Sequence, residues 1–324
     1  MPFLLPSVTM GSATGFDFSA VTSPHRMQPG LRRLAPGAPQ LTPSRRGDPV
    51  LGEKLVVLRK FSPQALLAAP GFDAAPALRA LCEHAAAEHP GAWQRGDDGR
   101  WRAPLLGWSV LGDELKPEAA PAPGLGSCLS ALPPEWRLPA LLCLAFAEDF
   151  AVIDGDSACI PWLAVCLPSH WAPEDKVGRH FSEVHAPVAD NQLLVNAGEH
   201  LARLVTQPER WERFVWTITR HPLLQAHPDR VHTTWSPAAT ADELAAHAFF
   251  RTEHQTFIPV PSLHQAVFTI RVGVTPLAEA LADPAQARRV HDALSTMSPA
   301  VLAYRGLTDA RDRLLDWLAR RASS

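Results

Sequence analysis

The middle of the chain alternates between apolar and polar residues, which is typical of β-strands. Such alternation runs over 214–219 and again over 266–274. The second run faces 249–258 across a turn rich in proline, which predicts a hairpin. Another hairpin is expected over 150–167, where Asp154-Gly155-Asp156 separates two apolar runs, because an Asp-Gly pair favours a tight turn.

Helical spacing of apolar residues flanks these strands on both sides. After Asp73, which is positioned to cap a helix, apolar residues recur every three to four positions until His89-Pro90-Gly91. A helix with one apolar stripe is expected to follow Asp190 as its cap. The expected helices beyond the first cover about 138–148, 191–205 and 308–321. Strands in the middle and helices at both ends predict an α+β fold around an antiparallel sheet.

Composition divides the chain into an arm and a body. Residues 1–50 are rich in Pro, Gly and Ser and show little periodicity, so we expect a partly extended N-terminal arm. The remaining residues, 51–324, are expected to form a single domain. With 46% hydrophobic residues in 324, the chain is long and apolar enough to bury a substantial core.

Charge and cysteine usage exclude several classes of protein. A net charge of −3 and a pI near 6.5 leave no cationic excess for phosphates, so no nucleic-acid partner is expected. The five cysteines include no Cys-x-x-Cys pair, which fits neither a disulfide framework nor an iron–sulfur or zinc cradle. No apolar run is long enough to span a bilayer and no secretion signal is visible. We therefore expect a cytoplasmic protein that does not enter a membrane.

Several common catalytic signatures are missing. The sequence contains no Walker loop, no His-Glu-x-x-His zinc helix and no dinucleotide fingerprint after a strand. The segment 107–112 approaches a serine nucleophile elbow but has one residue too many before its second glycine. Hydrolase and nucleotide-binding chemistry are therefore not favoured.

Two segments carry candidate chemistry instead. Over 167–188, a histidine lies between a proline-punctuated turn and a second X-Pro bend, and proline makes this support stiff and non-helical. In the second segment, a strand would turn Arg251, Glu253 and Gln255 to one face and His254 to the other. Such a polar row is either a solvated sheet face or an inward face that needs a polar ligand, because buried charge is costly when unpaired.

Together these segments resemble a known family. The carrying motifs are Pro-Ser-x-Trp-x-Pro-x-x-Lys-x-Gly at 168–178, His-x-Pro-Val at 185–188, Arg-x-Glu-x-Gln-Thr at 251–256 and Ala-Val-Phe-Thr-Ile at 266–270. In this order they look like the alpha-subunit family of haem-dependent oxidative N-demethylases, and the likeness covers about 28–318. Two positions depart from the family pattern: His254 stands where arginine is usual, and Ala189 where proline is usual.

The resemblance implies a PAS-like haem-binding catalytic domain with C-terminal helices over 51–324. It implies haem b as cofactor, a small secondary or methylated amine and O2 as substrates, and formaldehyde as a product. A separate flavin and iron–sulfur reductase subunit would supply electrons, and folate-linked capture of formaldehyde would also lie on a partner. The alternatives are a non-catalytic haem sensor of gas or redox state, or an accessory subunit, and a cofactor-free interaction protein.

The resemblance also suggests roles for individual residues. His185 is the expected axial iron ligand, ahead of His180 and His254, although with 14 histidines a structural role is the competing interpretation. Glu253 is expected to pair with a protonated amine, and Arg251 to polarise bound oxygen or hold a haem propionate. With Gln255 these two form the expected catalytic set. The remaining expected haem contacts are Lys176 and Arg179 at the propionates, and Trp171 and Trp235 against the macrocycle; each is also compatible with an ordinary surface or core role.

Overall fold

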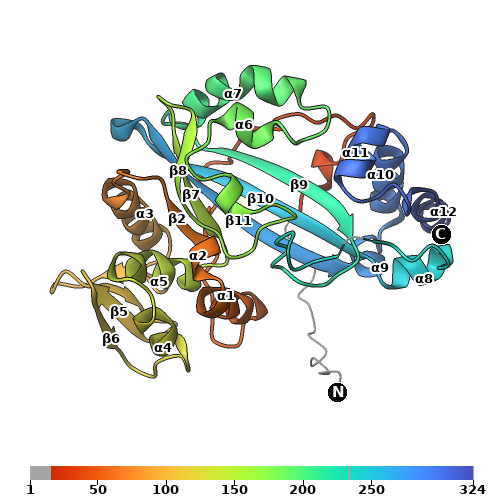
Figure 1. Cartoon of the computed structure of the whole chain (residues 1–324). Coiled ribbons are helices and arrows are strands. Elements are labelled where there is room, and N and C mark those ends of the chain that lie inside the picture. The colour runs from red at the N-terminus through yellow and green to blue at the C-terminus, as the bar shows by residue number, and fades with distance from the viewer. Residues whose placement is uncertain (1–15, 233, 324) are drawn as a thin grey trace.

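A seven-stranded antiparallel sheet organises the protein (Figure 1). The computed structural model describes residues 16–232 and 234–323; the first fifteen residues of the expected arm lie outside this part. The strand order is β1-β9-β10-β11-β7-β8-β2. In that order the strands are Arg32–Arg33, Trp211–Thr219, Phe249–Val260, Gln265–Pro276, Asp149–Asp154, Cys159–Ala164 and Leu66–Ala68. The predicted α+β fold with an antiparallel sheet and helices at both ends is confirmed.

The two predicted hairpins form the centre of the sheet. Strands β10 and β11 pair along their whole length, from Phe249 opposite Pro276 to Val260 opposite Gln265. The turn therefore starts later than the sequence predicts, at Pro261, and closes through His264 at φ 50°. Strands β7 and β8 form the second hairpin around Gly155, as predicted. Both hairpins are confirmed, and they place the segment after β8 beside the long central strands.

One face of the sheet carries the largest hydrophobic core, under helices from the first half of the chain. These helices are α1 (Pro49–Lys60), α2 (Ser62–Ala65), α3 (Ala75–Glu88), α4 (Leu125–Ser130) and α5 (Arg137–Ala145). Helix α3 confirms the helix predicted after Asp73, whose carboxylate accepts a hydrogen bond from the N–H of Ala75 at 2.9 Å. Helix α5 confirms the helix predicted over 138–148 but ends three residues earlier.

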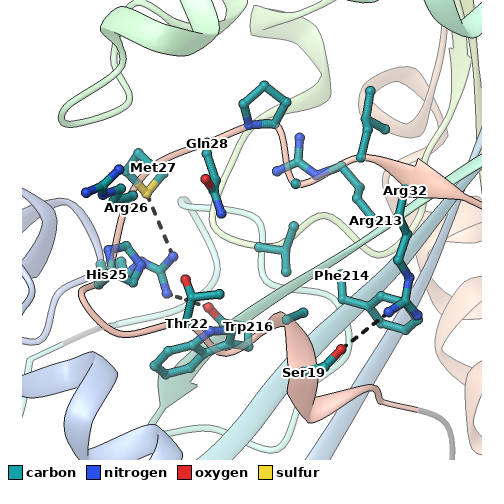
Figure 2. A pocket seen from close by; sticks show the side chains of 16 residues that line it. Ser19, Thr22, His25, Arg26, Met27, Gln28, Arg32, Arg213, Phe214 and Trp216 are labelled. Atoms are coloured by element: carbon teal, nitrogen blue, oxygen red, sulfur yellow. Dashed lines mark hydrogen bonds between the residues drawn. The ribbon is translucent and has the colours of Figure 1, made fainter.

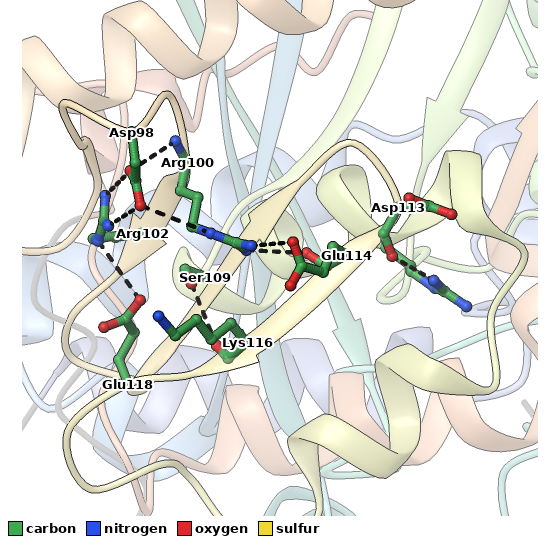
Figure 3. Close-up of polar contacts among 9 residues, drawn as sticks. Asp98, Arg100, Arg102, Ser109, Asp113, Glu114, Lys116 and Glu118 are labelled. Carbon is green, nitrogen blue, oxygen red and sulfur yellow. Dashed lines mark hydrogen bonds and ion pairs between the residues drawn. The ribbon is translucent and has the colours of Figure 1, made fainter.

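A small four-stranded sheet lies beyond these helices, built from β3 (Gln94–Arg95), β4 (Trp101–Ala103), β5 (Trp108–Leu111) and β6 (Glu114–Pro117). Salt bridges link its exposed edges (Figure 3). Arg100 pairs with Glu114 across the sheet, and Arg102 contacts Asp98 at 2.6 Å. Because the carboxylates of these pairs are exposed, each pair contributes little to stability. This sheet lies apart from the chemistry described below.

The C-terminal helices form a second core at the other end of the sheet. They are α8 (Ala241–Ala246), α9 (Leu277–Ala280), α10 (Pro284–Ser295), α11 (Pro299–Tyr304) and α12 (Arg311–Ala322). Helix α12 confirms the predicted last helix, with Leu314 and Leu318 fully buried. No helix in the described ranges is long and apolar enough to cross a bilayer.

Helices α6 (Phe181–His185) and α7 (Gln192–Val205) cover the face of the sheet opposite α3. The predicted helix over 191–205 is confirmed, but the predicted capping role of Asp190 is wrong. Asp190 adopts φ 54°, and its carboxylate accepts a hydrogen bond from Ser298 Oγ at 2.6 Å. This contact ties the loop before α7 to the start of α11 instead of capping α7.

Candidate functional site

The candidate site is built on the sheet face that α6 and α7 cover. Alternate residues of β10 point to this face, and its register sets Thr217 opposite Arg251 and Arg213 opposite Gln255. Glu253 lies between them and accepts a hydrogen bond from the Gln255 amide. We call these facing positions of β9 and β10, with the segments that cover them, the site face.

His254 points to the opposite face, as the alternation predicts. Its Nε2 lies 2.7 Å from Glu212 Oε2, and its ring stacks on Phe214 with centroids 4.4 Å apart. Arg32 contacts the same carboxylate through its Nε at 2.9 Å. The residue that departs from the family pattern is therefore held in a polar cluster behind the site face.

Arg251 fastens the site face to two loops. Its Nε donates to Ser169 Oγ at 2.8 Å, and its terminal nitrogens donate to the carbonyls of Pro168, Leu223 and Leu224 at 2.6 to 3.1 Å. Burial lowers the pKa of Arg251 to about 10, a value at which the group stays charged at neutral pH. Because the guanidinium has only five N–H groups, nearly all of its donors are used on protein atoms.

His185 is the last residue of helix α6, so the expectation of a non-helical support is wrong for this residue. Its ring is held in a defined tautomer. Its Nδ1 lies 2.8 Å from the carbonyl oxygen of Phe181, which can only accept, so Nδ1 carries the proton. The ring also stacks on Phe181 with centroids 4.0 Å apart. Burial lowers the pKa of His185 to about 4, with Arg213 and Lys176 adding to the shift, so the imidazole is neutral and its Nε2 keeps a free lone pair.

The other expected haem contacts lie in different surroundings. Lys176 donates to the carbonyl of Val184 at 2.8 Å, which ties the preceding turn to α6, and Arg179 is exposed. Trp171 packs near β7 and β8 with Val177. Trp235 belongs to the C-terminal core, where its Nε1 donates to the carbonyl of Gly306 at 2.7 Å. His180 caps α6 through its Nδ1.

The structure adds site-face residues that sequence reasoning did not single out. Arg213 has a buried Nε without a hydrogen-bond partner among the described residues, and burial lowers its pKa while Glu253 opposes the shift. His170 and His221 lie with ring centroids 5.4 Å apart, and burial lowers the pKa of each to about 4. Only one weak signal marked His221 in the sequence, its place before Pro222 at the end of a strand.

Several unsatisfied polar atoms lie at this face. In the described chain, His170 Nδ1, Arg213 Nε and Thr217 Oγ1 are buried and lack a hydrogen-bond partner. Native proteins rarely leave buried polar atoms unpaired, so such a group indicates a missing polar ligand. A haem fits these residues because His185 offers a neutral imidazole whose second nitrogen is anchored to a backbone carbonyl, as iron-ligating histidines are.

A second polar cluster lies in the core and has a different explanation. Cys143, Cys166 and Asp149 come close enough to bind a cation. The ammonium of Lys54, however, lies 3.0 Å from Asp149 Oδ1 and donates to three backbone carbonyls. This cluster is a buried ion pair that joins α1 to β7.

The fold and the site face define a mixed α+β protein that presents a neutral, backbone-anchored histidine above an antiparallel sheet, a setting suited to iron in a porphyrin. The model of one family, described as haem-dependent oxidative N-demethylase, alpha subunit-like, matches residues 62–315. The chain belongs to this family. The family description indicates haem dependence and oxidative chemistry, and the words alpha subunit imply further subunits.

Proposed function

We propose that this chain binds haem b on the site face and, as an alpha subunit, oxidises a small secondary or methylated amine. His185 would ligate the iron through Nε2, because its Nδ1 is committed to Phe181 and its ring is neutral. This single geometry carries the proposal. In this reading the central sheet with α6 and α7 acts as a PAS-like haem-binding scaffold.

The haem, when bound, would supply the O2 chemistry that converts an N-methyl group to formaldehyde and leaves the shorter amine. The residues of the chain would position the substrate. Glu253 is 7% exposed, and its carboxylate would pair with an alkylammonium and accept its proton. Gln255 donates to that carboxylate and fixes its orientation. Arg251 would act as a positioning residue, since its hydrogen bonds hold the loops around the site.

Electrons and product handling would come from partners. The described cysteines are unpaired, and four of the five are buried in the core, so they offer no cradle for an iron–sulfur cluster. We therefore propose a separate flavin and iron–sulfur reductase subunit as the electron donor. Folate-linked capture of formaldehyde would belong to another subunit.

The purified protein tests the ligand assignment. We expect a Soret band that shifts or weakens in His185→Ala and returns when free imidazole is added. His180→Ala is the matched control, because His180 caps the start of the same helix but uses its Nδ1 on Ser182. An identical spectrum in His185→Ala and wild type would reject the assignment. Formaldehyde release from dimethylamine with a reductase present then separates an enzyme from a haem sensor.

A further inference from the structure

A cavity of about 290 Å³ lies at the edge of the sheet, between the N-terminal arm and the outer side of β9 (Figure 2). Residues 19–32 of the arm form one wall, and β9 and the residue after α11 form the others. Its lining is cationic: it contains Arg26, Arg32, Arg213, Arg305 and His25, and no aspartate or glutamate. The cavity therefore favours an anionic occupant.

Two of these arginines form no salt bridge in the described part of the chain. Arg32 pairs with Asp17 and Glu212, and Arg26 is exposed to solvent. In the described chain, neither Arg213 nor Arg305 forms a salt bridge. Arg305 donates to the carbonyl of Trp216 and reaches Met27 Sδ at 3.9 Å. Both guanidiniums are partly buried. Because a cation that leaves water without a paired anion is unfavourable, they indicate that negative charge is missing from the cavity.

The cavity adjoins the site face. Arg213 and Val215 line the cavity, and the register of β9 places them opposite Gln255 and Glu253. The charge of Arg213 also acts on His185, which puts the cavity within electrostatic reach of the proposed iron ligand. Pockets that enclose whole cofactors measure roughly 300–1,000 Å³, so this cavity suits the charged edge of a larger group.

We propose that Arg213 and Arg305 bind the two propionate carboxylates of the haem whose iron His185 holds, a step that rests on the proposed function. Each guanidinium presents N–H groups in a planar fork that matches a carboxylate. Two arginines and two carboxylates balance in charge. This assignment replaces Lys176 and Arg179, because Lys176 is engaged with the Val184 carbonyl and Arg179 is exposed. The arm would then close the cavity over the propionate edge.

Haem titration of the haem-free full chain tests the proposal. We expect Arg213→Gln and Arg305→Gln each to raise the Kd for haem about tenfold or more, as loss of a charged hydrogen bond does. Haem dimethyl ester, which lacks the negative charges, should bind wild type more weakly by a similar factor. The ester should bind wild type and Arg213→Gln equally. Arg33→Gln is the control, since it removes a charge next to Arg32 at the same sheet edge but does not line the cavity.

The outcomes separate this inference from the proposed function. If wild type forms no His185-dependent Soret band, the proposed function fails and takes the inference with it. If the band forms, both variants bind haem as tightly as wild type, and wild type binds the ester as tightly as haem, then only the propionate assignment fails. Inorganic phosphate provides a further test. If it raises the Tm of haem-free wild type but not of Arg213→Gln, while haem affinity is the same in both, the cavity binds a free anion and the assignment is overturned.

Discussion

Arg251 and Ser169 are 82 residues apart in the chain, yet the Nε of one donates to the Oγ of the other at 2.8 Å. This contact fixes the start of the segment that runs to α6 and His185 against the central strand β10. The same guanidinium also holds Leu223 and Leu224 through their carbonyls. A single strand residue thus organises both loops that cover the site face.

We expect Arg251→Lys to lower the free energy of unfolding by about 3 kcal/mol. A lysine ammonium cannot reach all four acceptors, and the carbonyls left unpaired in a buried site are costly. Ser169→Ala should cost about 1–2 kcal/mol, because it removes one charged hydrogen bond. Urea unfolding measures both, with the exposed Arg33→Lys as control. A loss in Arg251→Lys no larger than in the control would contradict the anchoring role.

The free energy of unfolding should also decrease at acid pH because His170 is buried in its neutral form. Burial lowers its folded pKa to about 4, below the unfolded value near 6.5, so the unfolded state binds more protons between these values. The free energy of unfolding therefore decreases as pH falls through this window. Between pH 7 and pH 5, we expect the free energy of unfolding of His170→Gln to fall by about 2 kcal/mol less than that of wild type. His200→Gln, on the exposed side of α7, should follow wild type. If the free energy of unfolding falls equally with pH in all three proteins, the lowered pKa of His170 is refuted.

Local pattern predicted most of the fold. The alternation over 266–274 and the Asp-Gly turn at 154–156 define β11 and the β7–β8 hairpin, because strand period and turn chemistry depend on neighbouring residues alone. The predicted capping role of Asp190 is wrong because its carboxylate accepts a hydrogen bond from Ser298, more than a hundred residues away. A long-range partner of this kind leaves no local pattern.

The candidate site was predicted only in part, for the same reason. The alternation along β10 predicted that Glu253 and His254 point to opposite faces of the sheet, and their hydrogen-bond partners agree. Arg213 and His221 come from β9 and the loop after it, and only pairing of β9 with β10 brings them to the site face. The placement of Trp235 likewise depends on packing with the C-terminal helices, which the sequence motif does not encode.

The buried pair of Lys54 and Asp149 should dominate the stability of the first core. Both side chains are fully buried, with Nζ and Oδ1 3.0 Å apart. Burial alone lowers the pKa of Lys54, but Asp149 and the nearby thiols raise it above its usual value, so the ammonium stays charged. We expect Lys54→Met to cost about 3–5 kcal/mol, since it leaves Asp149 buried and uncompensated.

A double-mutant cycle measures this coupling. Asp149→Asn alone should also destabilise, and Lys54→Met combined with Asp149→Asn should cost less than the sum of the two single losses by at least about 1 kcal/mol. Guanidinium chloride unfolding of the four proteins gives the interaction free energy. Simple additivity would mean that the two side chains act independently.

Trp235→Phe should change stability and leave the haem spectrum alone. The substitution removes the hydrogen bond from Nε1 to Gly306 within the C-terminal core, a loss of about 1 kcal/mol in the free energy of unfolding. Trp235 lies in the core that also contains Trp216 and Phe250, behind the site face. A displaced Soret band in Trp235→Phe, with unchanged stability, would place this tryptophan against the macrocycle instead.

Glu253→Gln tests how the substrate is held. The carboxylate is 7% exposed, and an alkylammonium that leaves water for such a site needs a negative partner. We expect the Kd for dimethylammonium, followed by optical titration of the haem protein, to rise about tenfold or more. In turnover with a reductase, KM should rise more than kcat falls, because the lost contact binds substrate before the reaction as well as during it.

The control for this substitution is Glu209→Gln, an exposed carboxylate that pairs with Arg33 at the edge of the same sheet. It should leave both the Kd and KM unchanged. Glu253 also raises the pKa of Arg213, so its negative charge stabilises the charged form of that arginine. If Glu253→Gln weakens haem binding while dimethylammonium binds the remaining holoprotein as tightly as wild type, the carboxylate serves Arg213 rather than the amine.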